Sequence, residues 1–341
     1  MGFNRFGTAA MSVAAVVASA VCVGGAPVAA EPSDPPTSIT SAVFFGDSLT
    51  DAGTYGFRFT TNPGMTWAQH IAADFTQSPD PNEHVASYDD VYQGKPGISG
   101  PGGLNYAEGG ASKPYSTVSQ NPNGTPISAQ VQVERYLAQH GTFKPDQLVT
   151  LYIGTNDVAL NYDPRFDASL AQGLRDNQMP SAQVMAAERK RVQDAASAEA
   201  RTAEEILASG AQHLLVFKLF DLSYLPWFES TAARDYVREL TSVYNDELVA
   251  RLPKDPHLTI LDTAAFVDDL LANADKYGFA HGAGEDACLE SGQDYCNADA
   301  WKEPNADRTY IFVASEHFTT HAHELLADYV RNQISPGVAG S

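Results

Sequence analysis

Short apolar runs and longer amphipathic stretches alternate along most of this chain. Four apolar runs have the length and composition typical of strands that are buried on both faces. They lie at residues 42–45, 148–153, 213–219 and 258–261. These runs predict the strands of one internal sheet.

The segments between the apolar runs show the period of amphipathic helices. In the clearest, residues 181–209, apolar side chains recur on one face, and Gly210 follows where a helix can end. Further helices are expected near residues 67–75, 129–140, 231–252 and 320–333. Strands that alternate with helices predict a mostly parallel sheet between two helix layers.

The first thirty residues have the features of a secretory signal peptide. Arg5 precedes an apolar run over residues 9–23, and small residues follow up to Ala30. We expect cleavage after Ala30 and a secreted protein, extracellular or periplasmic. The alternative is a retained membrane anchor, but the apolar run is short for a bilayer and no stop-transfer charges follow it.

The remaining chain is expected to form one domain. Residues 31–40 are rich in turn-forming residues and predict a linker, and residues 41–335 predict a single folded domain. Within this domain, inserted loops are expected near residues 76–128, 160–180 and 280–308. Long loops in compact domains are usually functional or folded back on the sheet.

Charge and composition exclude several classes of function. The 341 residues include 42 acidic and 21 basic ones, and the formal net charge is -21. The hydrophobic share of 43% suffices for a sizeable core and argues against wholesale disorder. Because so acidic a surface repels phosphate backbones and anionic bilayers, we expect no nucleic acid partner and favour neutral or polar substrates.

The three cysteines fit an exported protein. Cys22 would leave with the signal peptide, and Cys288 and Cys296 remain as a pair in a short polar segment. A local disulfide is the expected use of such a pair. The alternative, a metal site on these thiolates, lacks a second Cys or His pair at zinc spacing.

Candidate chemistry lies where the predicted strands end. Ser48 follows the first apolar run, and Gly46 before it permits a sharp turn. A serine there can direct its hydroxyl into the crevice at the carboxyl ends of the strands, with its N–H toward a developing oxyanion. The alternative is a helix cap formed by Asp47 or Ser48.

Three later segments add to this site. Residues 105–111 supply a glycine turn, and residues 151–157 end an apolar run on Gly154, followed by the amide of Asn156. Residues 310–320 place His317 just before a predicted helix. A serine, a histidine, an amide and a flexible turn are the parts that acyl transfer through a serine requires.

With these segments in order over about residues 42–330, the chain resembles the GDSL esterase/lipase family of the SGNH hydrolase superfamily. The resemblance implies a three-layer α/β/α sandwich with a mostly parallel, five-stranded, flavodoxin-like sheet, and no cofactor. It also implies ester hydrolysis through an acyl-serine intermediate, as an esterase, lipase, phospholipase or acyltransferase. By position, Ser48 matches the nucleophile and His317 the general base, and the oxyanion donors are the Ser48 N–H, the Gly110 N–H and the Asn156 amide.

The chain departs from the family at one position. The family usually has an aspartate three residues before the histidine, and this chain has Ala314 there. Glu316 is no substitute, because adjacent side chains in an extended segment point in opposite directions. A backbone carbonyl or a bound anion such as chloride could orient His317 in a Ser-His dyad. The alternatives are a weakened or inactive ester-binding protein, or an Asp-to-Ala change in this particular chain.

Other polar residues near these segments have less specific explanations. His321 and His323 form a histidine-rich cluster with His317, but it lacks a suitably spaced carboxylate, and we expect no metal. Asp51 and Asp157 are interpreted as turn-stabilising residues.

Overall fold

The computed structural model describes residues 38–84, 98–112, 127–290 and 294–334. All described residues fall within one compact unit. The expected signal peptide, most of the expected linker and parts of the first expected loop lie outside the described residues.

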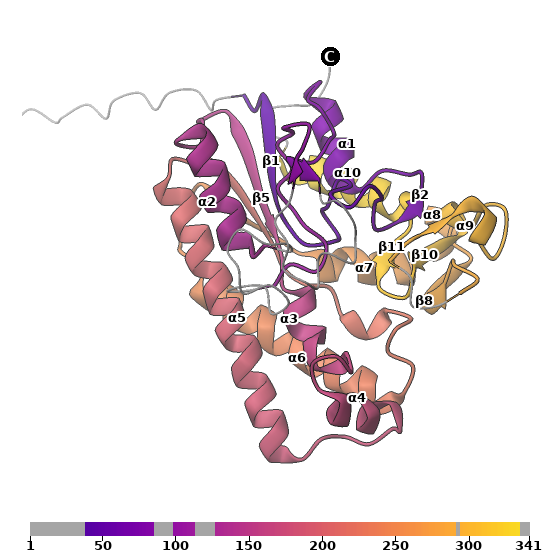
Figure 1. Ribbon diagram of the computed structural model, residues 1–341. Coiled ribbons are helices and arrows are strands. Elements are labelled where there is room, and N and C mark those ends of the chain that lie inside the picture. Colours follow the sequence, from indigo (N-terminus) through magenta and orange to yellow (C-terminus); the bar gives the residue numbers. More distant parts are fainter. Residues whose placement is uncertain (1–37, 85–97, 113–126, 291–293, 335–341) are drawn as a thin grey trace, which may run out of the picture. The chain divides into compact units, whose positions relative to one another are not determined.

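Four parallel strands form the central sheet (Figure 1), and they coincide with the four predicted apolar runs. They are β1 (Ser41–Gly46), β5 (Gln147–Tyr152), β6 (His213–Phe217) and β7 (Leu258–Leu261), in the order β1-β5-β6-β7. The carboxyl ends of these strands therefore lie along one edge of the sheet, where open α/β folds bind ligands.

The expectation of five strands was wrong by one. Beside β1, where a flavodoxin-like sheet has its fifth strand, Asn105 forms a single parallel bridge with Phe44. The Phe44 N–H donates to the Leu104 carbonyl at 3.0 Å, and the Tyr106 N–H donates to the Phe44 carbonyl at 2.8 Å. The Glu108 N–H donates to the Gly46 carbonyl at 3.2 Å, but the Gly46 N–H donates to the Gln132 side chain, so the ladder does not continue as a regular strand. Its position still corresponds to the strand order 2-1-3-4-5.

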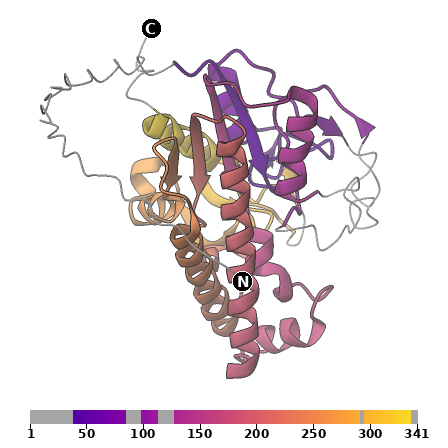
Figure 2. The same cartoon turned by 90° about the vertical axis from the view of Figure 1, so that its left-hand side faces the viewer.

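Helices cover both faces of this sheet (Figures 1 and 2). On one face α1 (Trp67–Asp74) packs against α10 (Thr320–Ile334). On the other, α5 (Ala182–Ala208) packs between α2 (Ala129–His140) and α6 (Thr231–Arg251). The doubly covered parallel sheet confirms the predicted three-layer α/β/α class.

Serine N-caps begin three of the predicted helices. The hydroxyls of Ser128, Ser181 and Ser230 each accept the N–H three residues further on, at the starts of α2, α5 and α6. Such a cap typically contributes about 1 kcal/mol. These caps explain why the observed starts agree with the predicted ones.

Shorter elements complete the main body. They are β2 (Thr61–Asn62), β3 (Glu83–His84), β4 (Ile98–Ser99), α3 (Thr155–Ala159), the 3-10 turn η2 (Leu160–Tyr162), α4 (Ala168–Arg175), η3 (Leu222–Tyr224), α7 (Thr263–Ala272) and α8 (Ala274–Tyr277).

A second, smaller sheet follows near the C-terminus. It joins β8 (His281–Asp286), β10 (Tyr310–Val313) and β11 (His317–Phe318) in the order β11-β10-β8. Strand β10 pairs parallel with β8 and antiparallel with β11. Between β8 and β10 lie β9 (Cys296–Asn297), η4 (Ala298–Ala300) and α9 (Ala306–Thr309).

The predicted disulfide is present in the segment after β8. Cys288 and Cys296 are bonded, with their Cα atoms 6.0 Å apart. Both cysteines are buried and pack in a small cluster with Val313 of the second sheet and Ala314 of the turn that follows it.

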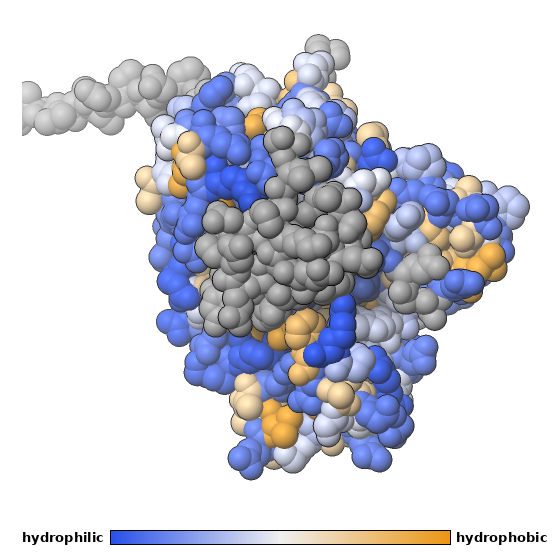
Figure 3. Space-filling model, in the orientation of Figure 1, coloured by the Kyte–Doolittle hydropathy of each residue, from blue (hydrophilic) through white to orange (hydrophobic). Residues whose placement is uncertain are grey.

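Hydrophilic residues cover most of the face shown in Figure 3, and hydrophobic residues occur there in small separate groups. Over the described residues, we find no helix of sufficient length and apolar character to span a bilayer.

Candidate active site

Ser48 lies in the turn that follows β1. A Cβ on Gly46 would come within 2.3 Å of the Tyr152 carbonyl oxygen on the neighbouring strand, so this position requires glycine. The Gln132 side chain accepts the Gly46 N–H at 2.9 Å and donates to the Gly46 carbonyl at 2.8 Å. The turn is thereby fixed to β5 on one side and to helix α2 on the other.

His317 lies next to Ser48, although 269 residues separate them in the sequence. Its Nε2 is 2.9 Å from the Ser48 Oγ. The ring also packs against Phe59, with 5.0 Å between ring centroids. Both Ser48 and His317 are buried, with 7% and 3% of their surface exposed. The structure therefore brings the predicted nucleophile and the predicted base into hydrogen-bonding contact.

The other ring nitrogen of His317 has no such contact. Within the described ranges, no group forms a hydrogen bond with the buried Nδ1. Burial lowers the pKa of His317 to about 3, because a charged imidazolium would lose its solvation there. The imidazole is therefore neutral at ordinary pH.

The predicted oxyanion donors gather around the same turn. Strands β1 and β5 pair with Gly46 opposite Tyr152, so Ser48 and Asn156 follow neighbouring strand ends. The Asn156 Nδ2 donates to the Ala111 carbonyl at 2.8 Å, which joins residues 151–157 to the glycine turn at residues 105–111. Gly110 adopts a positive φ of 81° in that turn. Among the residues that the structure describes, the other hydrogen of the Asn156 amide has no acceptor.

The two predicted backbone donors also remain available. Neither the Ser48 N–H nor the Gly110 N–H donates to any residue in the described part of the chain. Free N–H groups beside a nucleophile are the arrangement that stabilises a tetrahedral oxyanion.

Asp51 has a larger role in this site than a single turn would require. Its Oδ1 accepts the N–H groups of Gly53 and Thr54, both at 2.8 Å, and its Oδ2 accepts the Gly109 N–H at 2.9 Å. The side chain is fully buried, and burial raises its pKa to about 6. Asp51 therefore joins the turn after Ser48 to the turn that holds Gly110. The sequence shows only an acidic residue three positions after the serine, which does not reveal this second contact.

We expect Asp51→Asn to lower both stability and kcat. The amide would present N–H groups to backbone donors, and the mismatch should lower the free energy of unfolding by about 1–3 kcal/mol. Because the displaced donor precedes Gly110, kcat should fall while KM changes little. Chemical denaturation and steady-state kinetics on a soluble ester would measure both effects. Wild-type kcat in the folded variant would contradict this role.

The histidines near His317 have separate partners. His321 contacts the Glu324 carboxylate at 3.1 Å and the Tyr277 carbonyl at 2.8 Å, and the His323 Nδ1 accepts the Trp67 N–H at 3.2 Å. No group of three or more His, Cys, Asp or Glu side chains arranged for a metal ion occurs among the residues the structure describes.

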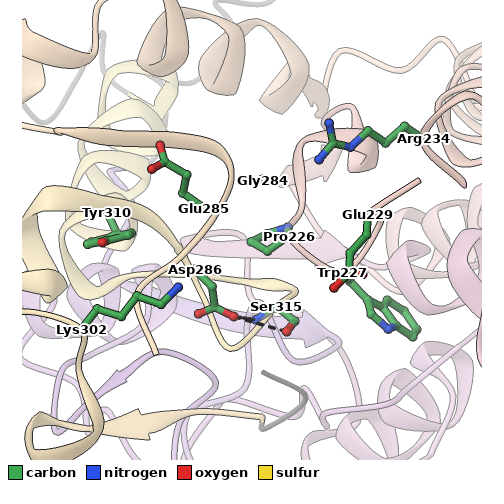
Figure 4. A pocket seen from close by; sticks show the side chains of 10 residues that line it. All are labelled: Pro226, Trp227, Glu229, Arg234, Gly284, Glu285, Asp286, Lys302, Tyr310 and Ser315. Atoms are coloured by element: carbon green, nitrogen blue, oxygen red, sulfur yellow. Dashed lines mark hydrogen bonds between the residues drawn. The ribbon is translucent and has the colours of Figure 1, made fainter. Parts of the chain in front are cut away.

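A pocket of about 560 Å³ lies beside the turn that carries the histidine (Figure 4). Its charges are mixed, with the cations of Arg234 and Lys302 and three carboxylates. Neither Ser48 nor His317 lines it. The lining residues are Pro226, Trp227, Glu229, Arg234, Gly284, Glu285, Asp286, Lys302, Tyr310 and Ser315.

Two curated relatives resemble this chain over most of its length. An uncharacterized protein in the trpE-trpG intergenic region of Pseudomonas putida is 26% identical in an alignment over 320 residues that covers 88% of this chain and 49% of the relative. The chain thus spans about half the length of that relative. The phosphatidylcholine-sterol acyltransferase of Aeromonas hydrophila is 26% identical over 296 residues, covering 81% of this chain and 71% of the relative.

Two solved structures of hydrolases have a similar backbone trace. A catalytic mutant of an acetylxylan esterase from Geobacillus stearothermophilus has a TM-score of 0.43 at 14% identity, covering 89% of this chain and 98% of its own. A lipase/acylhydrolase from Enterococcus faecalis has a TM-score of 0.37 at 14% identity, covering 87% and 95%. The family model of the GDSL-like lipases and acylhydrolases matches residues 43–330, and the chain therefore belongs to that family.

Proposed function

We propose that this protein is a secreted carboxylic-ester hydrolase that acts through an acyl intermediate on Ser48. The observation that carries the proposal is the 2.9 Å contact between the Ser48 Oγ and the His317 Nε2. A serine hydroxyl is a weak nucleophile until a base takes its proton, and a neutral imidazole in contact with it is such a base. The disulfide agrees with secretion into an oxidising compartment.

In the first step, the Ser48 Oγ forms a bond to the ester carbonyl carbon while His317 Nε2 takes the hydroxyl proton. The carbonyl oxygen becomes an oxyanion and accepts hydrogen bonds from the Ser48 N–H, the Gly110 N–H and the Asn156 amide. The bond to the leaving alkoxide then breaks, and the alkoxide takes the proton from Nε2. Water repeats the sequence on the acyl-serine and releases the carboxylic acid.

The histidine tautomer in this mechanism requires a partner on its other side. To accept the Ser48 proton, Nε2 must be unprotonated, so Nδ1 carries the hydrogen. Since no described carbonyl or carboxylate accepts from the buried Nδ1, we favour a bound anion such as chloride as the acceptor. A chloride there would orient the ring and stabilise the imidazolium that forms, as the aspartate does in a triad.

We expect Ala314→Asp to raise or preserve kcat. Ala314 has a φ of 53°, and aspartate tolerates this left-handed conformation better than most residues. A carboxylate near Nδ1 would raise the pKa of His317, so the acid limb of kcat/KM should move upward by about 1–3 pH units relative to wild type. The wild type should lose activity when chloride is exchanged for gluconate, and the variant should not. A large fall in kcat would show that another group already occupies this place.

The substrate class is an ester with an apolar acyl group. Phe57 stacks on Tyr295 at 4.3 Å between centroids and contacts Phe59, which packs on the catalytic histidine. Phe59 is itself buried, and the partly exposed Phe57 beside it favours an apolar acyl chain. The relative named as an acyltransferase adds transfer to an alcohol as a second outcome of the same acyl-serine.

Labelling with a fluorescent alkyl phosphonate tests the proposal. An active serine hydrolase reacts covalently at Ser48, and peptide mapping would locate the adduct. Hydrolysis of p-nitrophenyl esters of increasing chain length would then separate an esterase from a lipase. The alternative, an ester-binding protein without turnover, is favoured by Ala314 in place of the aspartate. It predicts ester binding without labelling or hydrolysis.

A further inference from the structure

The turn that precedes His317 has an unusual backbone. Ala314 and Ser315 have φ values of 53° and 67°, and neither is a glycine. Side chains with a Cβ rarely adopt this left-handed region, and two consecutive residues persist in it only when their surroundings hold them there. The turn joins β10 to β11 and places His317 directly opposite Val313.

The Asp286 carboxylate holds this turn (Figure 4). Its Oδ1 accepts the Ala314 N–H at 2.9 Å, and its Oδ2 accepts the Ser315 N–H at 2.7 Å and the Ser315 hydroxyl at 3.3 Å. Oδ1 also accepts the Cys288 N–H at 2.9 Å. Both strained residues therefore donate their N–H groups to one carboxylate, which is only 7% exposed.

Asp286 occupies a fixed position relative to the histidine hairpin. It is the last residue of β8 and pairs with Phe312 of β10, and the Ala287 N–H donates to the Phe312 carbonyl at 3.1 Å. On the other side of the turn, the Ser315 carbonyl accepts the Trp227 N–H at 3.0 Å. The turn is thus held from the strand beside it and from the loop before α6.

We propose that Asp286 is a positioning residue for the catalytic step, because it fixes the main-chain turn from which His317 reaches Ser48. The inference rests on the proposed function. The imidazole has one hydrogen-bond contact within the described residues, so the placement of its Nε2 depends on the backbone that carries it. An aspartate at position 314, as in the family, would hold the imidazole ring itself. Asp286 instead holds the backbone that carries the ring.

Asp286→Asn tests this inference, with Glu285→Gln as the matched control. The asparagine keeps the shape but turns an NH2 group toward backbone N–H donors. We expect kcat to fall about 10- to 100-fold, as for a misplaced catalytic group, with KM within about twofold of wild type. Glu285 is the preceding residue of the same strand, and its carboxylate bonds to His281 and the Gly282 N–H instead. Its variant should retain wild-type kcat.

Rescue by glycine separates positioning from a general structural role. Glycine adopts φ of 53° without a Cβ penalty, so adding Ala314→Gly to Asp286→Asn should restore part of the lost kcat. If Asp286→Asn does not melt cooperatively, Asp286→Glu takes its place in both arms. Wild-type kcat in the folded Asp286 variant, or a loss that the glycine does not reduce, would overturn the inference.

The wild-type protein is measured first. Ester hydrolysis and phosphonate labelling at Ser48 in the wild type test the proposed function without reference to Asp286. An active wild type with an unaffected Asp286→Asn variant would therefore remove only the positioning role.

Discussion

Replacing Ser48 with alanine is expected to lower kcat for ester hydrolysis roughly 10⁴- to 10⁶-fold. The variant lacks the only oxygen in contact with the His317 Nε2 among the described residues, so no acyl intermediate can form. The oxyanion donors remain, and any residual rate should come from them. The decrease should appear in kcat, measured with a soluble p-nitrophenyl ester, and labelling by the phosphonate should disappear.

A matched control for this variant is Ser197→Ala. Ser197 lies on helix α5, where its hydroxyl bonds to Glu247 rather than to a group of the site. That variant should retain kcat and labelling. If Ser48→Ala keeps a cooperative thermal melt and hydrolyses esters at the wild-type rate, Ser48 is not the nucleophile and the proposed function fails.

Replacing Asn156 with alanine is expected to lower kcat about 10²- to 10³-fold with little change in KM. Loss of one preorganised donor to an oxyanion typically raises the barrier by about 3–4 kcal/mol. Here the change also removes the bond to the Ala111 carbonyl, so the glycine turn loses one of its contacts. Because the donor acts on charge that develops in the transition state, substrate binding should be nearly unaffected.

Asn161→Ala provides the comparison for this change. Asn161 follows in the same segment, and its amide donates to Glu188 at 2.8 Å instead. Steady-state kinetics of both variants on one ester would separate the loss of a donor from a general loosening of residues 155–162. Equal decreases in the two variants would contradict an oxyanion role for Asn156.

The main sheet and its helices could be predicted because each element has a local pattern. The run at residues 148–153 is apolar except for Thr150 and corresponds to a strand buried on both faces. Ser181 and Gly210 flank helix α5 where the sequence predicts its ends. Patterns of this kind reflect burial and backbone preference, which act over a few residues.

The elements that could not be predicted form through contacts between residues that lie far apart in the sequence. Strand β8, with the sequence HGAGED, has no apolar period and lies within an expected loop. It is a strand because it pairs with β10, about thirty residues further along the chain. The missing fifth strand has the same cause, since the Gly46 N–H that would continue the pairing beside β1 donates instead to Gln132, 86 residues away in the sequence.

Some residues of the site could be predicted from short sequence segments, and others could not because they act through contacts that are remote in sequence. Ser48, Gly110, Asn156 and His317 lie in short segments of recognisable composition, and the structure places them around one turn. Asp51 and Asp286 act through backbone N–H groups that are remote in sequence. A backbone N–H that donates to a distant carboxylate belongs to any residue type except proline. Such a hydrogen bond therefore leaves no pattern in the sequence around the donor.

The two halves of this site belong to different sheets. The central sheet presents Ser48 and Asn156, and the smaller sheet presents His317. The segment at β2 is bonded to the chain that follows the histidine: the Thr60 hydroxyl donates to the Phe318 carbonyl, and the Thr61 hydroxyl accepts the Thr320 N–H. Ile311, Phe312 and Phe318 of the smaller sheet are nevertheless buried in the same hydrophobic core as strands β1 and β5. Loss of activity on heating or in denaturant should therefore coincide with unfolding of the central sheet, as in a cooperative two-state transition.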